Sequence, residues 1–326
     1  MRAVVTGATG CIGRVLCREL TARGWQVRAL VRPGRDHAHL AGSFAEIRTG
    51  DILAAESLDG LAEGAEVVFH LAARVTDHGS RSLFHAAIVD GTRNVLQASA
   101  GRAGRFLHVS STTACGVGRH LRGRKEEDTC FRSGVPYSDA KLEAEALVGS
   151  YGSRFPEGFA IVRPSNVLGP GSPYVDEVCR RLLSPFGVPL IDGGRHDASL
   201  VYVDNLVDAV ILAGSRPQAA GRVYHVCDDW QASWKRYLTE LAAFLGKAPG
   251  GNIPFRAAWG VGHVLERVCT PLGLRPPVTR LAAHIMGRDN HVDSSRAQTE
   301  LGWRTRISYG EAMQQIGRYV NRAFSG

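Results

Sequence analysis

Short, largely apolar segments alternate with amphipathic segments through the first half of the chain. The apolar segments span residues 3–5, 26–31, 67–71, 106–110 and 160–163. Between the first two, residues 14–22 place Leu16 and Leu20 one helical turn apart, and Gly24 ends that stretch. Apolar strands separated by helices are typical of a parallel sheet covered on both faces. The pattern predicts an α/β fold of the Rossmann type, with a doubly wound parallel sheet.

After Pro164 the pattern changes, because proline and glycine become frequent and the order of elements becomes less regular. Residues 201–203 and the helical stretch 206–213 still fit the sheet and its cover. The apolar, proline-punctuated stretch 250–287 is typical of a separate lobe. We therefore predict a core domain of residues 1–165, to which 198–228 return, and a smaller C-terminal lobe of 166–197 and 229–326.

The chain has 326 residues, and a formal charge of +8 arises from 39 basic and 31 acidic residues. Such a balance suits nucleic acid, a membrane surface or an anionic small molecule. The basic residues are scattered, and their densest run is Arg119 to Lys125. No zinc-ligand spacing or RNA-binding signature accompanies it, so we expect no nucleic-acid partner. A phosphorylated cofactor is the favoured anion.

The seven cysteines are an odd number without a Cys-x-x-Cys pair, and the twelve histidines form no ligand-like pair on a helix. Neither a disulfide framework nor a metal site is therefore predicted, and a reducing compartment fits better. The sequence opens directly on a strand, with no signal peptide before it and no run of about 20 apolar residues after it. We expect a cytoplasmic protein.

A glycine-rich turn follows the first predicted strand at once. Its glycines are Gly7, Gly10 and Gly13, and an amphipathic helix comes next. The first glycine permits the tight turn, the second lets the backbone approach a pyrophosphate, and the third lets the helix pack closely. The amides at the start of the helix then face the anion. The motif predicts a bound dinucleotide.

The second strand ends in the run from Arg28 to Arg32, and no acid follows before Asp36. An acid at this point would bind the adenosine ribose and disfavour a 2′-phosphate. Arg32 can pair with such a phosphate and Arg28 can assist, although both could instead be solvated at the strand edge. NADP(H) is favoured over NAD(H).

Three residues form a candidate reaction centre. Ser111 ends the strand at 106–110, at the sheet edge where ligands of such folds bind. Tyr137 and Lys141 lie four residues apart on a predicted helix, so they share one face. A phenol of pKa about 10 is a poor base, and a neighbouring ammonium favours its phenolate. Ser111 can then hold a substrate oxygen while Tyr137 transfers a proton and a nicotinamide transfers hydride.

With these motifs the chain resembles an extended short-chain dehydrogenase/reductase, of the NAD-dependent epimerase/dehydratase superfamily, over nearly its whole length. The resemblance implies that Ser111, rather than Ser110, is the catalytic serine and that Asn94 supports the active-site water network. It also implies a homodimer. The residues expected at the cofactor are Gly7, Thr9, Gly10, Cys11, Ile12, Gly13, Arg32, Asp51, Ile52, Leu71, Ala72, Ala73, Lys141, Pro164, Asn166 and Val167. Cys11 departs from the pattern, since an aromatic residue is usual there.

Two branches of this family compete. Nucleotide-sugar epimerases and dehydratases usually carry an arginine shortly before a motif like Tyr202-Val203-Asp204-Asn205-Leu206, to bind the phosphates of the sugar nucleotide. Ala198 stands there in this chain, and Arg195 lies out of register. Dehydratases also carry an Asp-Glu pair after the catalytic serine, which this sequence lacks. These features disfavour the nucleotide-sugar branch.

The second branch comprises 3β-hydroxysteroid and sterol-4-carboxylate dehydrogenases, which residues 274–280 and 297–303 resemble. The apolar residues of the lobe would line a cleft, lean on a membrane surface or cover the lobe's own core: Trp259, Val261, Val264, Leu265, Leu272 and Leu281. We expect interconversion of a secondary hydroxyl and a ketone on a hydrophobic, sterol-like or aliphatic substrate. The alternatives are an epimerase or dehydratase that transfers hydride transiently, and a non-catalytic dinucleotide sensor.

Several polar residues are predicted to have no role in the reaction. Asp77, His78 and Arg81 are expected in a solvated loop. The acids Glu126, Glu127 and Asp128 are expected on a solvated face. His70 is expected to be a hydrogen-bonded residue at a strand end.

Overall fold

The computed structural model describes residues 1–34, 37, 46–185 and 187–324. A sheet of seven parallel strands forms its centre, in the order β10-β6-β5-β4-β1-β2-β3. The strands are β1 (Arg2–Thr6), β2 (Gln26–Val31), β3 (Glu46–Thr49), β4 (Ala65–His70), β5 (Ala103–Val109), β6 (Phe159–Pro164) and β10 (Arg222–Val226). The order reverses between β1 and β4, as in a doubly wound nucleotide-binding sheet. The predicted fold class is confirmed.

The five apolar segments of the sequence fall on β1, β2, β4, β5 and β6. Strands β3 and β10, at the two edges of the sheet, were not predicted. The residues of β3 are largely exposed and polar. Residues 201–203 lie mainly in β9 (Leu200–Tyr202), which pairs with β7 (Asn166–Leu168) in a separate small sheet. This small sheet lies at the junction between the core and the lobe.

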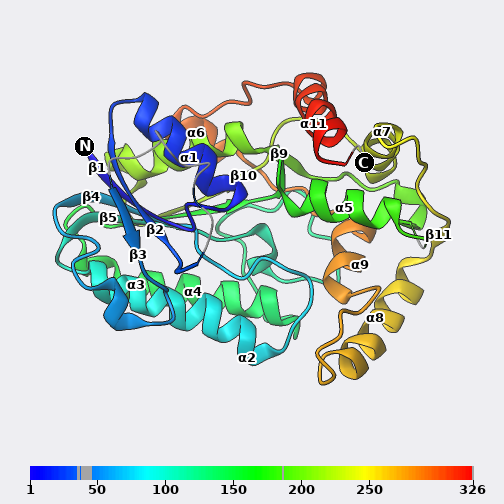
Figure 1. Cartoon of the computed structure of the whole chain (residues 1–326), viewed down its shortest axis with the longest axis horizontal. Helices are drawn as coiled ribbons and strands as arrows, with labels where there is room; N and C mark the ends of the chain where they lie inside the picture. Colours follow the sequence, from blue (N-terminus) through cyan, green and yellow to red (C-terminus); the bar gives the residue numbers. More distant parts are fainter. Residues whose placement is uncertain (35–36, 38–45, 186, 325–326) are drawn as a thin grey trace.

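Helices cover both faces of the main sheet (Figure 1). One face carries α1 (Cys11–Ala22) and α6 (Val203–Ser215), and the other carries α3 (Gly91–Ser99) and α4 (Pro136–Tyr151). Each layer buries its own apolar cluster, with Leu16 and Leu20 of α1 in one and Val95 and Val148 in the other. Short α2 (Arg81–Phe84) and a π-helical turn at His85–Asp90 lead into α3.

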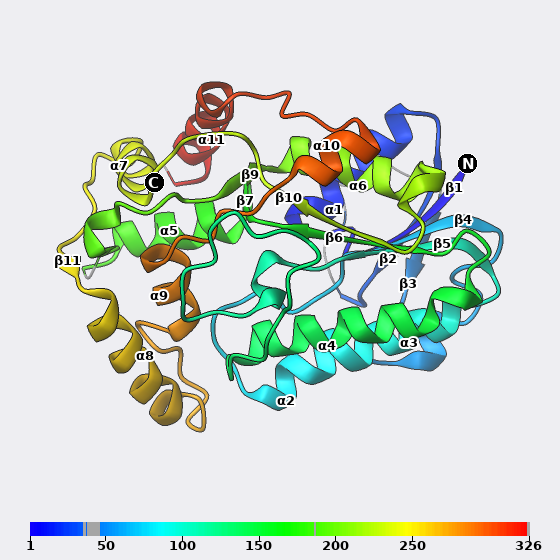
Figure 2. The same ribbon diagram turned by 180° about the vertical axis from the view of Figure 1, so that it is seen from behind.

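The lobe lies beyond the carboxyl edge of the sheet, as both views show (Figures 1 and 2). It contains α5 (Pro173–Leu183), α7 (Trp234–Ala243), α8 (Phe255–Cys269), α9 (Arg280–Gly287) and α11 (Tyr309–Ala323), with a two-stranded sheet of β8 (Leu190–Ile191) and β11 (Asn252–Ile253). Its core centres on Trp234 and Tyr237. In the part of the chain that is described, no helix combines the length and apolar character that a membrane span needs.

The chain returns from the lobe through α10 (Ser295–Leu301), which packs beside α6 and β10. Asn205 of α6 holds this return in place. Its side-chain amide donates to the Asp228 carboxylate and to the carbonyl of Ile307 at 3.0 Å each. Its backbone carbonyl accepts from the Trp303 indole at 2.8 Å. The Tyr202–Leu206 motif therefore joins the core, the lobe and the C-terminal segment.

Candidate active site

The glycine turn after β1 has room for no side chain. Gly7 has φ +72°, and a Cβ there would lie 2.8 Å from the backbone nitrogen of Ala72. A Cβ on Gly13 would lie 2.1 Å from the Gly7 carbonyl oxygen. Gly10 caps α1, so the free amides of the first helical turn face the carboxyl edge of the sheet. This cradle fits the pyrophosphate of a dinucleotide.

The other residues expected at the turn lie around it. The Thr6 hydroxyl accepts the amides of Leu71 and Ala72 at 3.2 Å each, which fixes the end of β4 beside the turn. Cys11 and Ile12 are half-buried at the start of α1, and the Cys11 thiol lies 3.5 Å from the Pro170 carbonyl oxygen. Burial raises the pKa of the Cys11 thiol to about 12, so it stays a neutral packing group.

Asp51 and Ile52 follow β3 in a tight turn. The Asp51 carboxylate accepts the Leu53 amide at 3.0 Å. The Asn94 side chain donates to the Ile52 carbonyl at 2.8 Å, so it braces this turn. Within the described ranges no hydrogen bond joins the Asn94 side chain to Ser111, Tyr137 or Lys141. Its role in a water network stays a prediction.

The two arginines of β2 have different surroundings. The Arg28 guanidinium donates to Glu46 Oε2 and to the Leu61 carbonyl at 2.7 Å each, so it is already paired within the protein. Arg32 is exposed just after the strand. Asp36, the first acid after it, lies outside the described residues.

Ser111 follows β5 and caps the short 3₁₀ helix Thr112–Cys115. Its hydroxyl oxygen accepts the Thr113 amide at 3.2 Å and lies 2.9 Å from the Thr113 hydroxyl. The neighbouring Ser110 is only 4% exposed, whereas Ser111 is partly open. The strand alternation therefore turns Ser110 inward and leaves Ser111 at the sheet edge.

Tyr137 and Lys141 lie in the first two turns of α4, which Pro136 begins. Burial raises the pKa of the Tyr137 phenol to about 12, and a hydrogen bond with Ser111 opposes that rise. Lys141 is 2% exposed, and its ammonium donates to the Val109 carbonyl at 2.9 Å. Burial lowers the pKa of Lys141 to about 8, and the charge of Glu145 opposes that change. A neutral phenol thus meets a serine hydroxyl at the edge of the sheet.

Residues 3–227 match the NAD dependent epimerase/dehydratase family. The chain belongs to this family. A ketoreductase for 4-hydroxy-2-methyl-3-oxo-4-farnesyl-3,4-dihydroquinoline-1-oxide from Stigmatella aurantiaca is 32% identical, over 97% of this chain and 96% of its own. A 2-alkyl-3-oxoalkanoate reductase from Stenotrophomonas maltophilia is 27% identical, over 97% and 98%. The solved UDP-glucuronic acid 4-epimerase of Bacillus cereus, in complex with UDP-glucuronic acid and NAD, has a TM-score of 0.74 at 22% identity and 99% coverage of both chains.

Membership of the epimerase/dehydratase family makes the protein an NAD(P)-dependent enzyme of the extended short-chain dehydrogenase/reductase type.

The remaining residues expected at the cofactor lie at the end of β6. Pro164 ends that strand, and Asn166 and Val167 begin β7. The Asn166 amide donates to the Ala198 carbonyl at 2.7 Å, and its oxygen accepts the Tyr174 hydroxyl at 2.5 Å. This segment therefore connects the reaction centre with the lobe.

Tyr174, which the sequence analysis did not consider, lies beside the candidate site. It lies at the start of α5, and its hydroxyl is near enough to Tyr137 and Asp77 for their charges to raise its pKa further, after burial. Nothing in the local sequence marks it, because its position depends on how the lobe folds over the sheet.

Apolar side chains surround Tyr137 on two sides. The Phe84 ring meets its ring edge-on, with centroids 6.0 Å apart. On the lobe side, Tyr137 packs with buried Val117, Val135 and Leu281, and with partly buried Trp259 and Ile285. We call this second group the apolar wall. Tyr137 therefore packs against hydrocarbon on both of these sides.

The apolar residues predicted for the lobe divide into two groups. Trp259 and Leu281 belong to the apolar wall, and Leu265 is half-buried. Val261, Val264 and Leu272 are instead 51%, 59% and 66% exposed, on the outer side of α8 and the segment that follows it. The sequence could not separate these groups, because both belong to one amphipathic stretch.

Two predictions of solvated polar segments are wrong in part, for Asp77 and Glu126, whereas Arg81 and Glu127 of the same segments are 60% and 59% exposed. The Asp77 carboxylate accepts the Thr279 hydroxyl at 3.2 Å and Arg275 at 3.4 Å, so its loop is tied to the lobe. The Glu126 side chain is 3% exposed and accepts the His225 amide at 2.8 Å. Both contacts join residues distant in the sequence. His70 is hydrogen-bonded as predicted, with its ring nitrogens 2.8 Å and 3.0 Å from the hydroxyls of Thr6 and Thr92.

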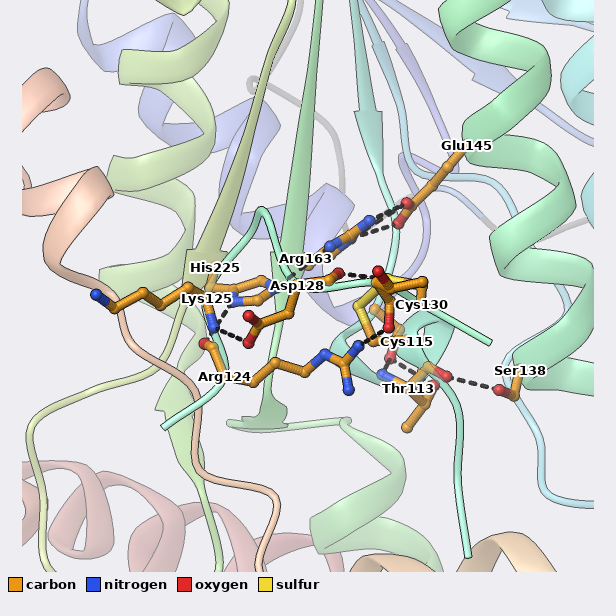
Figure 3. Close-up of a disulfide and its surroundings, with 12 residues drawn as sticks. Thr113, Cys115, Arg124, Lys125, Asp128, Cys130, Ser138, Glu145, Arg163 and His225 are labelled. Atoms are coloured by element: carbon orange, nitrogen blue, oxygen red, sulfur yellow. Dashed lines mark hydrogen bonds and ion pairs between the residues drawn. A yellow bond between two sulfur atoms is a disulfide. The ribbon is translucent and has the colours of Figure 1, made fainter. Parts of the chain in front are cut away.

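A disulfide joins Cys115 and Cys130, although the sequence analysis found no support for disulfide bonding (Figure 3). The loop after the 3₁₀ helix returns and brings the two Cα atoms to 4.0 Å. The other five cysteines are free. A count and a spacing could not show this pairing, because it depends on the path of the returning loop.

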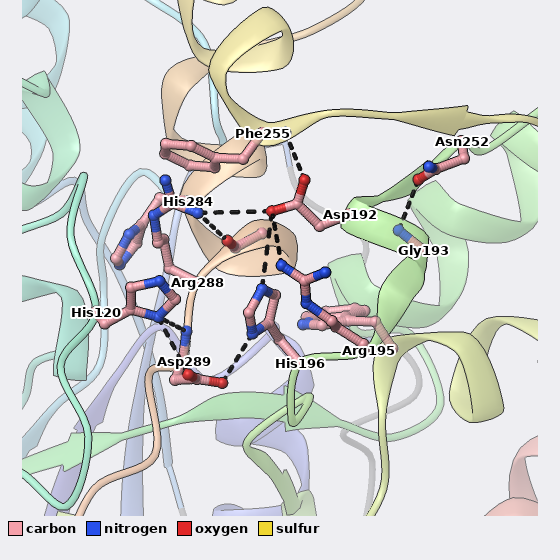
Figure 4. Close-up of polar contacts among 12 residues, drawn as sticks. His120, Asp192, Gly193, Arg195, His196, Asn252, Phe255, His284, Arg288 and Asp289 are labelled. Atoms are coloured by element: carbon pink, nitrogen blue, oxygen red, sulfur yellow. Dashed lines mark hydrogen bonds and ion pairs between the residues drawn. The ribbon is translucent and has the colours of Figure 1, made fainter.

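A polar clamp holds the loop after Ser111 against the lobe (Figure 4). The Asp289 carboxylate lies 3.1 Å from His120 Nδ1 and 2.9 Å from His196 Nδ1, and it pairs with Arg122 at 2.5 Å. These two histidines and Asp289 bring possible metal-ligand atoms within 4.8 Å of one another. Asp192, 3.9 Å from His196, is itself near two more arginines at 3.7 Å and 3.8 Å. Arginines already balance the negative charge of both carboxylates. We therefore assign the cluster a structural role, in which it holds the loop, rather than a role in metal binding.

The variant Lys141→Met is expected to stabilise the fold while it removes activity. The pKa of Lys141 is about 8 in the folded chain against an ordinary value of 10.5. Between these values the unfolded chain binds more protons, so the free energy of unfolding of the native protein rises with pH there. At neutral pH the buried ammonium therefore costs on the order of 1–3 kcal/mol, which methionine avoids.

Urea denaturation at about pH 7 and about pH 10 measures this effect, with Lys235→Met, at an exposed site, as the matched control. The stability gain of Lys141→Met should be larger at the lower pH, and the control should show neither gain nor pH dependence. A variant less stable than the native protein at both pH values would contradict the burial argument.

Proposed function

We propose that this family member is an NAD(P)H-linked reductase, and in reverse a dehydrogenase, that interconverts a ketone and a secondary hydroxyl on a hydrophobic substrate. The observation that carries the proposal is the apolar wall packed against Tyr137. A sugar ring requires hydrogen-bond partners on the walls of its site, whereas a hydrocarbon skeleton does not. The ketoreductase from Stigmatella aurantiaca, named for a farnesyl-bearing ketone, supports this substrate class.

The side chains divide the reaction between them. When bound, the nicotinamide supplies hydride to the carbonyl carbon. Ser111 donates a hydrogen bond to the carbonyl oxygen, and Tyr137, whose pKa of about 12 keeps it protonated at neutral pH, gives its proton to the same oxygen. The Lys141 ammonium, one helical turn along α4, stabilises the phenolate that remains. Oxidation of the alcohol follows the same path in reverse.

Turnover of apolar ketones tests the proposal. Purified protein is titrated with NADPH and NADH and then assayed on sterol, flavonoid and aliphatic ketones. We expect loss of nicotinamide absorbance with at least one apolar ketone. Cofactor binding without net oxidation across the whole panel would contradict the proposal and favour the epimerase alternative.

The nucleotide-sugar alternative requires a cation for the phosphates. Ala198 is fully buried where that branch carries arginine, and Arg195 is 72% exposed and directed to Asp192 at 3.8 Å. We therefore expect calorimetry to detect no binding of UDP- or dTDP-sugars at millimolar concentration. Tight binding of either would favour the epimerase alternative, since a UDP-glucuronic acid 4-epimerase that binds NAD is among the similar structures.

Arg32 is proposed to select NADP(H) over NAD(H). Its exposed guanidinium follows β2, and we place it at the extra phosphate of the cofactor. Arg32→Ala should raise the Kd for NADPH about 5- to 30-fold and leave that for NADH unchanged, since one charge-assisted contact is lost. Fluorescence titration measures both constants. Arg48→Ala, at an exposed arginine of neighbouring β3, is the matched control, and an equal loss for both cofactors would contradict the assignment.

The oligomeric state of the protein, its location and any contact with a membrane stay predictions. A homodimer and a cytoplasmic location still rest on resemblance and composition. Peripheral membrane contact would involve the exposed side of α8, which carries Val261 and Val264.

A further inference from the structure

The outer side of α8 and the tip that follows this helix carry a cluster of exposed apolar side chains. Its members are each more than half exposed, and we call them the outer apolar surface: Val261, Val264, Val268, Leu272 and Leu274. The three valines are three and four positions apart, so they share one side of the helix. A single exposed apolar residue is ordinary, whereas a group of them marks a surface that binds something.

The opposite side of α8 already supplies the packing of this helix within the protein. That side buries Phe255 and Ala258 and contributes Trp259 to the apolar wall. A Cβ on Gly262 would lie 3.0 Å from the backbone nitrogen of Arg280, so α8 lies close against the start of α9. Figures 1 and 2 both show α8 at the outer corner of the lobe, with α9 beside it. Surface helices usually turn polar residues outward, so an apolar outer side indicates a partner.

Positive charge borders the outer apolar surface. Arg256 and Arg267 are eleven positions apart, which is close to three helical turns, so they line one edge of α8. Both are exposed, and neither forms an ion pair with a described residue. Glu266 is the only acid among residues 250–280 of the sequence. Its carboxylate pairs with Arg280 at 2.8 Å, and both side chains are only 15% exposed.

The tip beyond α8 is held against the rest of the protein. Arg275, directly after Leu274, forms an ion pair with Glu177 of α5 and lies 3.4 Å from the Asp77 carboxylate. This arginine is therefore already paired, and the two leucines of the tip stay beside the valines of α8. The outer apolar surface thus exists in the folded protein before any partner binds.

Charge decides which partner fits this surface. A second copy of the chain, docked by the same surface, would bring Arg256 and Arg267 toward their own counterparts, and each chain carries a formal charge of +8. An anionic bilayer instead offers phosphates to the arginines and acyl chains to the valines and leucines. Helices that lie in a membrane interface combine an apolar side with basic residues in this way.

We propose that the outer apolar surface docks the protein on an anionic lipid bilayer, with Arg256 and Arg267 at the lipid phosphates. The docked helix then lies between the lipid and the apolar wall, because Trp259 belongs to its opposite side. One consequence rests on the proposed function: an apolar ketone dissolved in the bilayer is concentrated at the side of the protein that bears the apolar wall.

Cosedimentation of the purified full-length protein with lipid vesicles tests the docking without cofactor or ketone. We expect the partition coefficient on phosphatidylcholine mixed with phosphatidylglycerol to exceed that on phosphatidylcholine alone about 10- to 30-fold, at about fivefold for each arginine. Val264→Ser should lower the partition coefficient on the mixed vesicles about 3- to 10-fold, because less apolar area enters the lipid. Leu83→Ser, at a leucine of α2 that is 52% exposed, should leave it unchanged.

A charge-reversal pair tests the role of the arginines. Arg256→Glu/Arg267→Glu should remove the preference for the mixed vesicles, because the edge of α8 then repels the lipid phosphates. Arg318→Glu/Arg322→Glu, at two exposed arginines of α11, makes the same change in net charge and should retain the preference.

Three outcomes would overturn the proposal. The first is binding of the native protein to neither kind of vesicle. The second is equal binding of the native protein, Val264→Ser and the charge-reversed α8 variant. The third is self-association in sedimentation velocity that Val264→Ser abolishes, which would assign the surface to a second copy of the chain. None of these measurements involves Tyr137, so each leaves the proposed ketone reduction to its own test.

Discussion

Replacing Tyr137 by phenylalanine is expected to lower kcat for ketone reduction about 10²–10⁴-fold, because the variant lacks the proton donor. The ring stays packed against Phe84 and the apolar wall, so only the hydroxyl and its contact with Ser111 are lost. The glycine cradle is untouched, so the Kd for the nicotinamide cofactor should change little. Stopped-flow measurement of nicotinamide absorbance with an accepted ketone gives the rate of the chemical step.

Tyr151→Phe is the matched control for this variant. Tyr151 ends the same helix, where Arg154 lies over its ring at 4.8 Å, far along α4 from the reaction centre. We expect its kcat to equal that of the native protein. Near-native hydride transfer by Tyr137→Phe would exclude the proposed mechanism, whereas a parallel loss in both variants would indicate damage to α4.

The sequence was sufficient for the elements that depend on local pattern. Buried apolar runs in the sequence predicted strands β1, β2, β4, β5 and β6. The spacing of its glycines predicted the glycine turn, where a side chain would not fit. Ser111, Tyr137 and Lys141 could be proposed because a strand end and one helix face bring them together. Strand β3 escaped because an exposed edge strand carries polar residues.

The contacts that could not be predicted all join residues far apart in sequence. Asp77 bonds Thr279 of the lobe, and Glu126 bonds His225 of β10. Cys115 meets Cys130 only because the loop after Ser111 doubles back. A charged residue in a local segment is expected to be exposed to solvent. Only the tertiary fold decides whether a distant partner pairs with that residue and buries it.

Breaking the buried ion pair of Arg163 and Glu145 is expected to have the largest effect on stability. The pair joins β6 to α4 at 2.6 Å, with side chains 7% and 6% exposed (Figure 3). Arg163→Met leaves the Glu145 carboxylate buried without its partner, which should lower the free energy of unfolding by about 3–5 kcal/mol. Urea denaturation measures the loss. Arg236→Met, in an exposed pair with Glu240 at 2.9 Å, should cost less than about 1 kcal/mol.

The double variant Arg163→Met/Glu145→Met distinguishes a missing partner from a general packing defect. It removes both charges, so it should recover most of the stability that Arg163→Met loses. A double variant less stable than either single variant would contradict this explanation and show that the pair contributes net stability.

The same pair also reaches the reaction centre, because Glu145 lies one helical turn from Lys141 and its charge raises the pKa of that ammonium. Glu145→Gln removes this charge, so the pKa of Lys141 should fall further below about 8. The alkaline limb of kcat/KM against pH should then move to lower pH, because the ammonium that stabilises the Tyr137 phenolate is lost earlier. A variant with lower stability but an unmoved limb would confine Glu145 to the fold. A shifted limb would make Glu145 a positioning residue that acts on the reaction through Lys141.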